Sequence, residues 1–300
     1  MSTPAPAALQ ALLHDLVDYA GLFPPAALDM ETAVRHYARY HASADHWMLG
    51  RFVVPAARLD EFAEAASHHR RHGGAPWRLS ALVGPDTAAD LARVAQFNDA
   101  AGPRGATVDV IEARAPGTAA IAALAAARPH GLAAYVEIPA SADPAPLASS
   151  LRAVRLRAKL RTGGVTPDAF PDPEEVVRFL RACAEAGVEC KLTAGLHHAV
   201  TGDYRLTYAA DSGRAPMFGF VNVVLAALLL RDGLDDAEAE RLLLERDPGT
   251  FTFDDEAARW REHAVPTARV AAGRARYLLG FGSCSFEEPV GEVRALGWME

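Results

Sequence analysis

Residues 154–195, VRLRAKLRTGGVTPDAFPDPEEVVRFLRACAEAGVECKLTAG, contain two short strand-like segments on either side of one helical segment. The strand-like segments, 154–164 and 187–195, alternate apolar and polar side chains, which is typical of strands with one buried face. Between them, Pro173 and the spacing of the apolar residues after it indicate a helix over 173–186. A strand, a helix and a second strand in this order predict two parallel strands in one sheet.

The same alternation of strand and helix recurs along most of the chain. We expect strands in the segments 48–55, 77–84, 106–114, 132–139, 154–164, 187–195 and 217–224. An eighth strand is expected either at 250–253 or within 277–286. Eight such units favour an α/β fold of the (β/α)8 or TIM barrel type, which typically takes roughly 250 residues. An open doubly wound sheet is the alternative, but the chain has neither GxGxxG after its first strand nor a GxxxxGK[ST] stretch.

The N-terminal segment precedes the first of these strands. We expect residues 1–46 to form a short helical extension, with a loop over Asp18–Pro25. The barrel domain would then cover residues 47–300.

Composition excludes several classes of protein. Half of the 300 residues are hydrophobic and the net charge is −8, so the chain can bury a large core and is a poor partner for nucleic acid or an anionic membrane. It has no apolar run of membrane-spanning length and no signal-peptide pattern at its start. The three cysteines, without CxxC spacing, argue against a disulfide framework or structural zinc. We therefore expect a cytoplasmic protein with a small-molecule partner, and a homo-oligomer stays an open alternative.

The basic residues are distributed unevenly between the two residue types. Lys159 and Lys191 are the only lysines among 30 basic residues, and the others are all arginines. Each lysine alternates with apolar neighbours in its strand, so the apolar faces meet the helices and both lysines point into the barrel. Two lysines at neighbouring strand ends indicate chemistry that needs a primary amine, because arginine stays protonated.

A reactive amine has requirements that this arrangement could meet. Glycines follow both strands, and glycine lets the backbone approach a ligand closely; they are Gly163, Gly164 and Gly195. Two neighbouring lysines are expected to lower each other's pKa by burial and like charge, and a neutral amine can act as a nucleophile or base. The alternative is a buried structural ion pair between a lysine and an inward acid such as Glu137 or Glu189.

The lysine strands resemble those of the class I, Schiff-base-forming barrel aldolases of the deoxyribose-phosphate aldolase type. That family carries its imine-forming lysine in K-x-[ST]-x-G, which is similar to KLRTG at 159–163, with Arg161 in place of Ser or Thr. Its second lysine, in K-x-x-G-G, tunes the first and is similar to KLTAG at 191–195. Its D-x-V-I strand carries a proton-relay aspartate and is similar to VDVIE at 108–112. The resemblance implies catalytic roles for Lys159, Lys191 and either Asp109 or Glu112.

Four further residues are predicted near the rim of the barrel. His197 and His198 directly follow the second lysine strand, although a surface position is about as well supported. Asn222 shares a predicted strand face with two phenylalanines. Ser283 lies in GSCS at 282–285, which resembles the phosphate-binding G-[TS]-S strand end of the same aldolase family. We expect these residues to bind substrate, together with the three glycines and Arg161.

The leading functional prediction is an enzyme of the lyase class. Lys159 would attack the carbonyl group of a small, anionic compound, and the iminium would act as an electron sink without any cofactor. Lys191 would tune that amine or carry protons, helped by Glu137 and by Asp109 or Glu112. Arg161 would hold a carboxylate or phosphate group of the substrate.

Two alternatives stay open. One is a metal-assisted acid/base lyase, racemase or dehydratase resembling the enolase superfamily, in which carboxylates would hold Mg²⁺. The other is a barrel without catalytic activity that binds a small anion through Lys159, Arg161 and Lys191.

Overall fold

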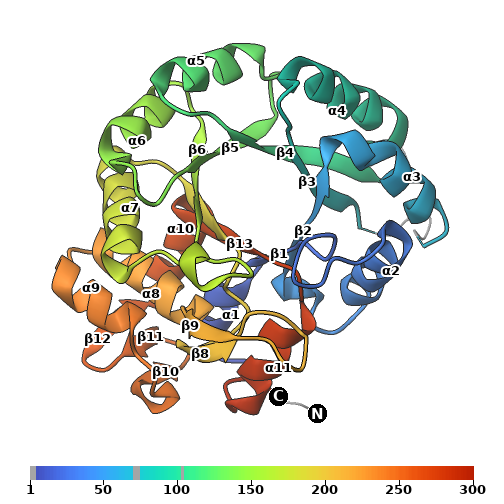
Figure 1. Ribbon diagram of the computed structural model, residues 1–300. Coiled ribbons are helices and arrows are strands. Elements are labelled where there is room, and N and C mark those ends of the chain that lie inside the picture. The colour runs from blue at the N-terminus through green and yellow to red at the C-terminus, as the bar shows by residue number, and fades with distance from the viewer. Residues whose placement is uncertain (1–4, 70–74, 103–104) are drawn as a thin grey trace.

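The computed structural model describes residues 5–69, 75–102 and 105–300. Eight parallel strands close into one barrel, in the order β1-β13-β7-β6-β5-β4-β3-β2. Their bounds are β1 (Val17–Tyr19), β2 (Leu49–Pro55), β3 (Trp77–Leu82), β4 (Ala106–Arg114), β5 (Ala133–Ile138), β6 (Arg157–Arg161), β7 (Cys190–Thr193) and β13 (Leu278–Ser283). Helices alternate with these strands and surround the barrel (Figure 1). The predicted (β/α)8 barrel is confirmed.

The helices are short and most of them bury one face. Their bounds are α1 (Ala7–Leu13), α2 (Met30–His41), α3 (Leu59–Ser67), α4 (Thr87–Ala101), α5 (Thr118–Ala127), α6 (Pro144–Ala153), α7 (Pro173–Ala186), α8 (Phe220–Arg231), α9 (Asp236–Leu243), α10 (Thr267–Arg276) and α11 (Glu287–Ala295). None of the helices in the described ranges is long and apolar enough to cross a membrane.

Local sequence explains the helix between the two lysine strands. Helix α7 begins with a capping box, in which the Asp172 side chain and the Glu175 side chain each bind the other residue's backbone N–H. It ends at Gly187, whose left-handed backbone (φ 64°) lets the chain turn back toward β7. The helix spans the predicted residues 173–186, so the strand–helix–strand prediction for this segment is confirmed.

The first barrel strand lies in the segment that we expected to be an extension. Strand β1 pairs with β13 on one side and with β2 on the other, so the chain before residue 47 completes the barrel. The expected loop over Asp18–Pro25 is therefore wrong for Asp18 and Tyr19. Three residues with an aspartate at the centre are too few to show a strand pattern in the sequence. Residues 1–4 of the expected extension lie outside the described part of the chain.

The expected strand at 217–224 is also wrong. Met217 ends β9 (Arg214–Met217), which pairs with β8 (Gly202–Arg205) in a small antiparallel sheet, and α8 begins three residues later. Every residue of α8 from Phe220 to Leu230 is buried, so the helix lacks the polar face that would have revealed its period. A continuous apolar run of this kind cannot be assigned to helix or strand from its pattern alone.

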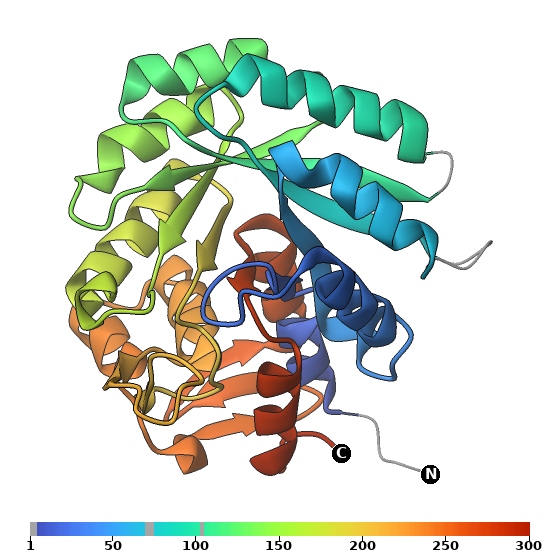
Figure 2. The same cartoon turned by 45° about the vertical axis from the view of Figure 1, so that its right-hand side comes forward.

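The two candidates for the eighth strand take different places. The segment within 277–286 supplies β13, which closes the barrel next to β1. The segment 250–253 instead contains β10 (Phe251–Phe253), which forms an antiparallel sheet with β11 (Ala257–Trp260) and β12 (His263–Pro266). This sheet lies outside the barrel (Figure 2), where it packs on α1 and α10.

Candidate active site

The two lysines lie side by side inside the barrel. Parallel pairing of β6 with β7 sets Lys159 opposite Lys191, and pairing of β5 with β6 sets Glu137 opposite Lys159. Lys159 is 5% exposed and Lys191 is 1% exposed. The inward direction that we predicted for both side chains follows from the alternation along the strands, whose apolar side chains face the helices. Two ammonium groups this deeply buried need counter-charges close by.

Glu112 on β4 provides a counter-charge to both lysines. Its Oε1 lies 2.8 Å from Nζ of Lys191, and its Oε2 lies 2.9 Å from Nζ of Lys159. The hydroxyl of Ser80 on β3 also donates to Oε1, at 2.8 Å. One carboxylate therefore joins both amines, and its position is fixed from three sides.

Each lysine has a second carboxylate of its own. Nζ of Lys159 lies 2.9 Å from Oε2 of Glu137, and Nζ of Lys191 lies 2.5 Å from Oδ2 of Asp18. The other oxygen of Asp18 accepts the backbone N–H of Arg51 at 2.7 Å. Sequence reasoning missed Asp18, because it lies in the three-residue strand that was expected to be a loop.

The carboxylates determine the direction of the pKa shifts. Burial alone would raise the pKa of Glu112, but Lys191 and Lys159 outweigh it and hold that pKa well below its usual range. Burial alone would lower the pKa of Lys191, but Asp18 and Glu112 outweigh it and raise that pKa. The expectation that the lysines lower each other's pKa is therefore wrong for Lys191, because the sequence did not reveal how many acids surround it.

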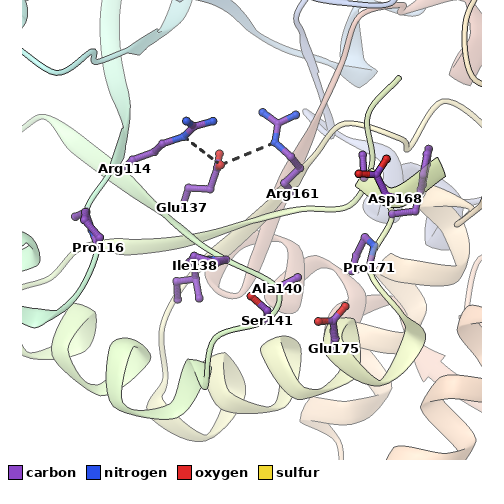
Figure 3. Close-up of a pocket in the computed structure, with 14 residues that line it drawn as sticks. Arg114, Pro116, Glu137, Ile138, Ala140, Ser141, Arg161, Asp168, Pro171 and Glu175 are labelled. Carbon is purple, nitrogen blue, oxygen red and sulfur yellow. Dashed lines mark ion pairs between the residues drawn. The ribbon is translucent and has the colours of Figure 1, made fainter. Parts of the chain in front are cut away.

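A pocket of about 590 Å³ opens at the carboxyl end of β4, β5 and β6. Glu137 lines it, and Figure 3 shows Arg114 and Arg161 reaching toward this carboxylate from both sides. Oε1 of Glu137 lies 3.4 Å from Nε of Arg114 and 3.9 Å from Nε of Arg161. Burial raises the Glu137 pKa, but Lys159 and then Arg161 and Arg114 lower it more, so the pKa falls overall. Glu137 thus connects the buried Lys159 to the pocket.

Asp109, the other predicted proton-relay acid, lies elsewhere in the barrel. Both of its carboxylate oxygens accept hydrogen bonds from Arg51, at 2.7 Å each. It lies where the register between β3 and β4 shifts by one residue, which explains why the two acids of β4 could not be assigned to one face from the sequence. Of these two acids, it is Glu112 that contacts the lysines.

The glycines after the lysine strands bring two loops together. A Cβ on Gly163 would lie 2.6 Å from Cα of Gly195, and a Cβ on Gly195 would lie 2.8 Å from the carbonyl oxygen of Thr162. The close approach seen here is between the backbones of two loops, and the approach of these glycines to a ligand stays a prediction. Gly195 has a left-handed backbone (φ 73°), and so does Ala194 (φ 64°), which replaces a glycine of the aldolase motif.

His197 and His198 line a second pocket, of about 340 Å³, together with Gly164 and Gly195, and Ser283 lies behind His197. Nδ1 of His197 lies 3.2 Å from Oε2 of Glu288 and 3.2 Å from Oγ of Ser283, and His198 pairs with Glu292. Burial lowers the pKa of His197, but its contacts with Cys284 and Glu288 outweigh this and raise the pKa to about 9. No described contact joins these residues to the lysines.

Asn222 lies on helix α8, away from both pockets. Its side chain accepts the backbone N–H of Thr201 at 3.1 Å and donates to the carbonyl oxygens of Leu242 and Glu245 at 2.8 Å each. These bonds join three segments of backbone. Within the described ranges, no group of three or more His, Cys, Asp or Glu side chains is placed to hold a metal ion.

Fold and site together define a (β/α)8 barrel with a buried cluster of two lysines and three carboxylates.

No protein-family model matches the chain. No curated protein matches it either. Among solved structures, it is similar to the Bacillus cereus spore cortex-lytic enzyme SleL, with 11% sequence identity and a TM-score of 0.41 over 94% of this chain and 73% of that one.

Proposed function

We propose that this protein is a lyase of the aldolase kind, which forms a Schiff base between Lys159 and a small anionic carbonyl compound. The observation that carries this proposal is the position of Glu137. One of its carboxylate oxygens contacts the Lys159 amine, and the other faces Arg114 in the pocket at the carboxyl end of β4, β5 and β6. A substrate carbonyl in that pocket would meet the amine and a proton acceptor together.

The same cluster gives the two lysines different roles. Lys191 is almost completely enclosed, and Asp18 and Glu112 raise its pKa, so it stays an ammonium group. Lys159 is nearer to the pocket, because its partner Glu137 lines it. We therefore assign the imine to Lys159 and a charge-stabilising role to Lys191.

The reaction at Lys159 needs one proton acceptor, and Glu137 can serve. Lys159 transfers a proton to Glu137, and its neutral nitrogen attacks the carbonyl carbon. A proton then moves from this nitrogen to the carbonyl oxygen, and the resulting carbinolamine loses its hydroxyl group as water when Glu137 returns the proton. The iminium carries the same positive charge as the ammonium group that it replaces, so Glu112 and Glu137 keep their counter-charge. Arg161 and Arg114 would bind the anionic group of the substrate.

Reductive trapping tests the imine directly. The protein is incubated with cyanoborohydride and a panel of small 2-oxo acids and phosphorylated or carboxylated aldehydes, and adducts are mapped by peptide mass spectrometry. Because the chain has only two lysines, the map distinguishes the two sites. We expect an adduct on Lys159 with at least one compound, and none on Lys191.

A matched variant separates catalysis from simple anion binding. Lys159→Arg keeps a cation between Glu112 and Glu137 but cannot form an imine. We expect it to bind the anionic compound while losing the adduct and all carbon–carbon bond cleavage. Activity retained in Lys159→Arg, or no adduct on Lys159 in the unchanged protein with any compound of the panel, would refute the proposal.

A further inference from the structure

A third pocket, of about 740 Å³, lies at the amino-terminal end of the barrel strands, opposite the lysine site. It opens where the chain enters β5, β6, β7 and β13. Among the described residues, six arginines line it and Glu189 is the only acid in its lining; the arginines are Arg128, Arg152, Arg155, Arg157, Arg231 and Arg276. We call this the arginine pocket. Its strong positive charge contrasts with the net charge of −8 of the whole chain.

Most of these guanidinium groups have no anionic partner. Arg157 pairs with Glu189, and Arg231 lies over the ring of Tyr277, with 5.8 Å between its Cζ and the ring centroid. Across the described parts of the chain, Arg152, Arg155 and Arg276 have neither an ion pair nor a side-chain hydrogen bond; the three are exposed. These three cations therefore share one pocket without an ion pair of their own, because its acid, Glu189, pairs with Arg157.

Arg128 adds a buried donor to the same pocket. Its Nη1 donates to the carbonyl oxygen of Leu132, but its Nε is buried and has no hydrogen-bond partner. A buried donor without an acceptor costs free energy of about 1–3 kcal/mol, so such groups are rare in folded proteins.

The positions of these arginines at helix ends explain why single arginines occur here. They do not explain why several arginines line the same pocket. Arg152, Arg231 and Arg276 lie in the last turns of α6, α8 and α10, where a cation interacts favourably with the helix dipole. That interaction needs no shared pocket and is weakened when the cations repel one another. Arg155 is held in a left-handed backbone conformation (φ 56°) at the edge of the same pocket.

We propose that the arginine pocket binds a small molecule that carries two or more phosphate groups. The planar guanidinium group binds phosphate oxygens through paired hydrogen bonds, which favours arginine over lysine at such sites. The pocket has the size of a small-molecule site. Its cations come from the entrances of β5, β6 and β13 and from the end of α8, so one phosphate group cannot reach all of them and a longer polyanion can.

Isothermal titration with inorganic tripolyphosphate tests the proposal. We expect saturable binding of one tripolyphosphate per chain, at least roughly tenfold tighter than orthophosphate at equal ionic strength. The double variant Arg155→Gln with Arg276→Gln should weaken binding roughly 10- to 100-fold, because each removes a charged hydrogen-bond donor.

Two further variants control for charge and for location. Arg35→Gln with Arg58→Gln removes the same charge from α2 and from the start of α3, and it should leave the affinity unchanged. Arg114→Gln with Arg161→Gln changes the pocket beside the lysines and should also leave it unchanged. Absence of saturable binding, or an equal loss of affinity in either control, would overturn the proposal.

Chemical protection gives a second measurement that needs no variant. Phenylglyoxal modifies exposed arginines, and tripolyphosphate should reduce modification of Arg152, Arg155 and Arg276 several-fold while leaving Arg35 unaffected. Equal modification of these residues with and without tripolyphosphate would contradict the proposed site.

Discussion

The two ends of the barrel both concentrate positive charge, but they neutralise it differently. At the carboxyl end, two lysines share three carboxylates, those of Asp18, Glu112 and Glu137. At the amino end, six arginines line one pocket, and Arg157 is the one of them that the described contacts pair with Glu189. Burial accounts for the difference: an enclosed ammonium group must find its counter-charge within the chain, whereas an exposed guanidinium group stays hydrated and can accept an external anion.

Removing the shared carboxylate should have the largest effect. Glu112→Gln leaves both lysines buried with one counter-charge fewer, so we expect the free energy of unfolding to fall by roughly 3–5 kcal/mol. Urea denaturation followed by circular dichroism measures this loss. Adding Lys191→Met to the Glu112→Gln variant should restore part of the stability, because it removes the more deeply buried of the two ammonium groups.

Glu189→Gln makes the same change as Glu112→Gln, but at the amino end of the barrel. The pair of Arg157 and Glu189 is partly exposed, so its loss should cost less than about 1 kcal/mol. If both glutamate variants lost the same stability, the contrast between the enclosed and the hydrated end would be wrong.

The next effect concerns how the stability that the buried lysine cluster contributes depends on pH. The pKa of Glu112 is lower in the folded chain than its ordinary 4.5, so its contribution is present above pH 4.5 and is lost as the pH falls below that value. The pKa of Lys191 is higher than its ordinary 10.5, so its contribution is present below pH 10.5 and is lost as the pH rises above it.

We expect roughly 1–3 kcal/mol of stability to be lost between about pH 6 and pH 3 through Glu112. Denaturation curves across that interval measure it, and Glu112→Gln should show a correspondingly shallower acid dependence. An identical acid dependence in the two proteins would mean that Glu112 is not held ionised by the lysines.

The smallest effect should come from the arginine pocket without ligand. Arg155→Gln with Arg276→Gln removes two exposed cations that have no described partner, so stability should stay the same or rise by up to about 0.5 kcal/mol. Thermal unfolding at low ionic strength measures the difference, and added NaCl should shrink it, since salt screens exposed charges. A loss above about 1 kcal/mol would show that these arginines stabilise the fold by themselves.

The regular parts of the barrel could be predicted because their patterns are local. The lysine strands and α7 follow from alternation, capping residues and glycine within 154–195. Strand β1 could not be predicted, because three residues become a strand only when β2 and β13 pair with them. Residues 220–224, the first part of the fully buried α8, were mistaken for a strand, because this helix lacks a polar face.

The candidate site was predictable in its residue types and only partly in its contacts. The rarity of lysine pointed to Lys159 and Lys191, and strand parity left both Glu137 and Glu189 as inward partners, of which the structure pairs Glu137 with Lys159. The choice between Asp109 and Glu112 depended on a register shift in β4, which local sequence does not determine. The convergence of six arginines depends on how the ends of separate helices assemble, so it could be found only in three dimensions.

Closure of the barrel by its first and last strands has a consequence for the order of folding. During synthesis, β13 (Leu278–Ser283) is made long after its neighbour β1 (Val17–Tyr19), because the other six barrel strands lie between them in the chain. Until then β1 and β7 each lack a hydrogen-bonded neighbour, and Asp18 cannot be fixed beside Lys191. Such a late long-range contact slows folding and exposes strand edges to aggregation. The nascent chain should therefore acquire its complete lysine cluster last, and chaperones that cover strand edges should increase its yield.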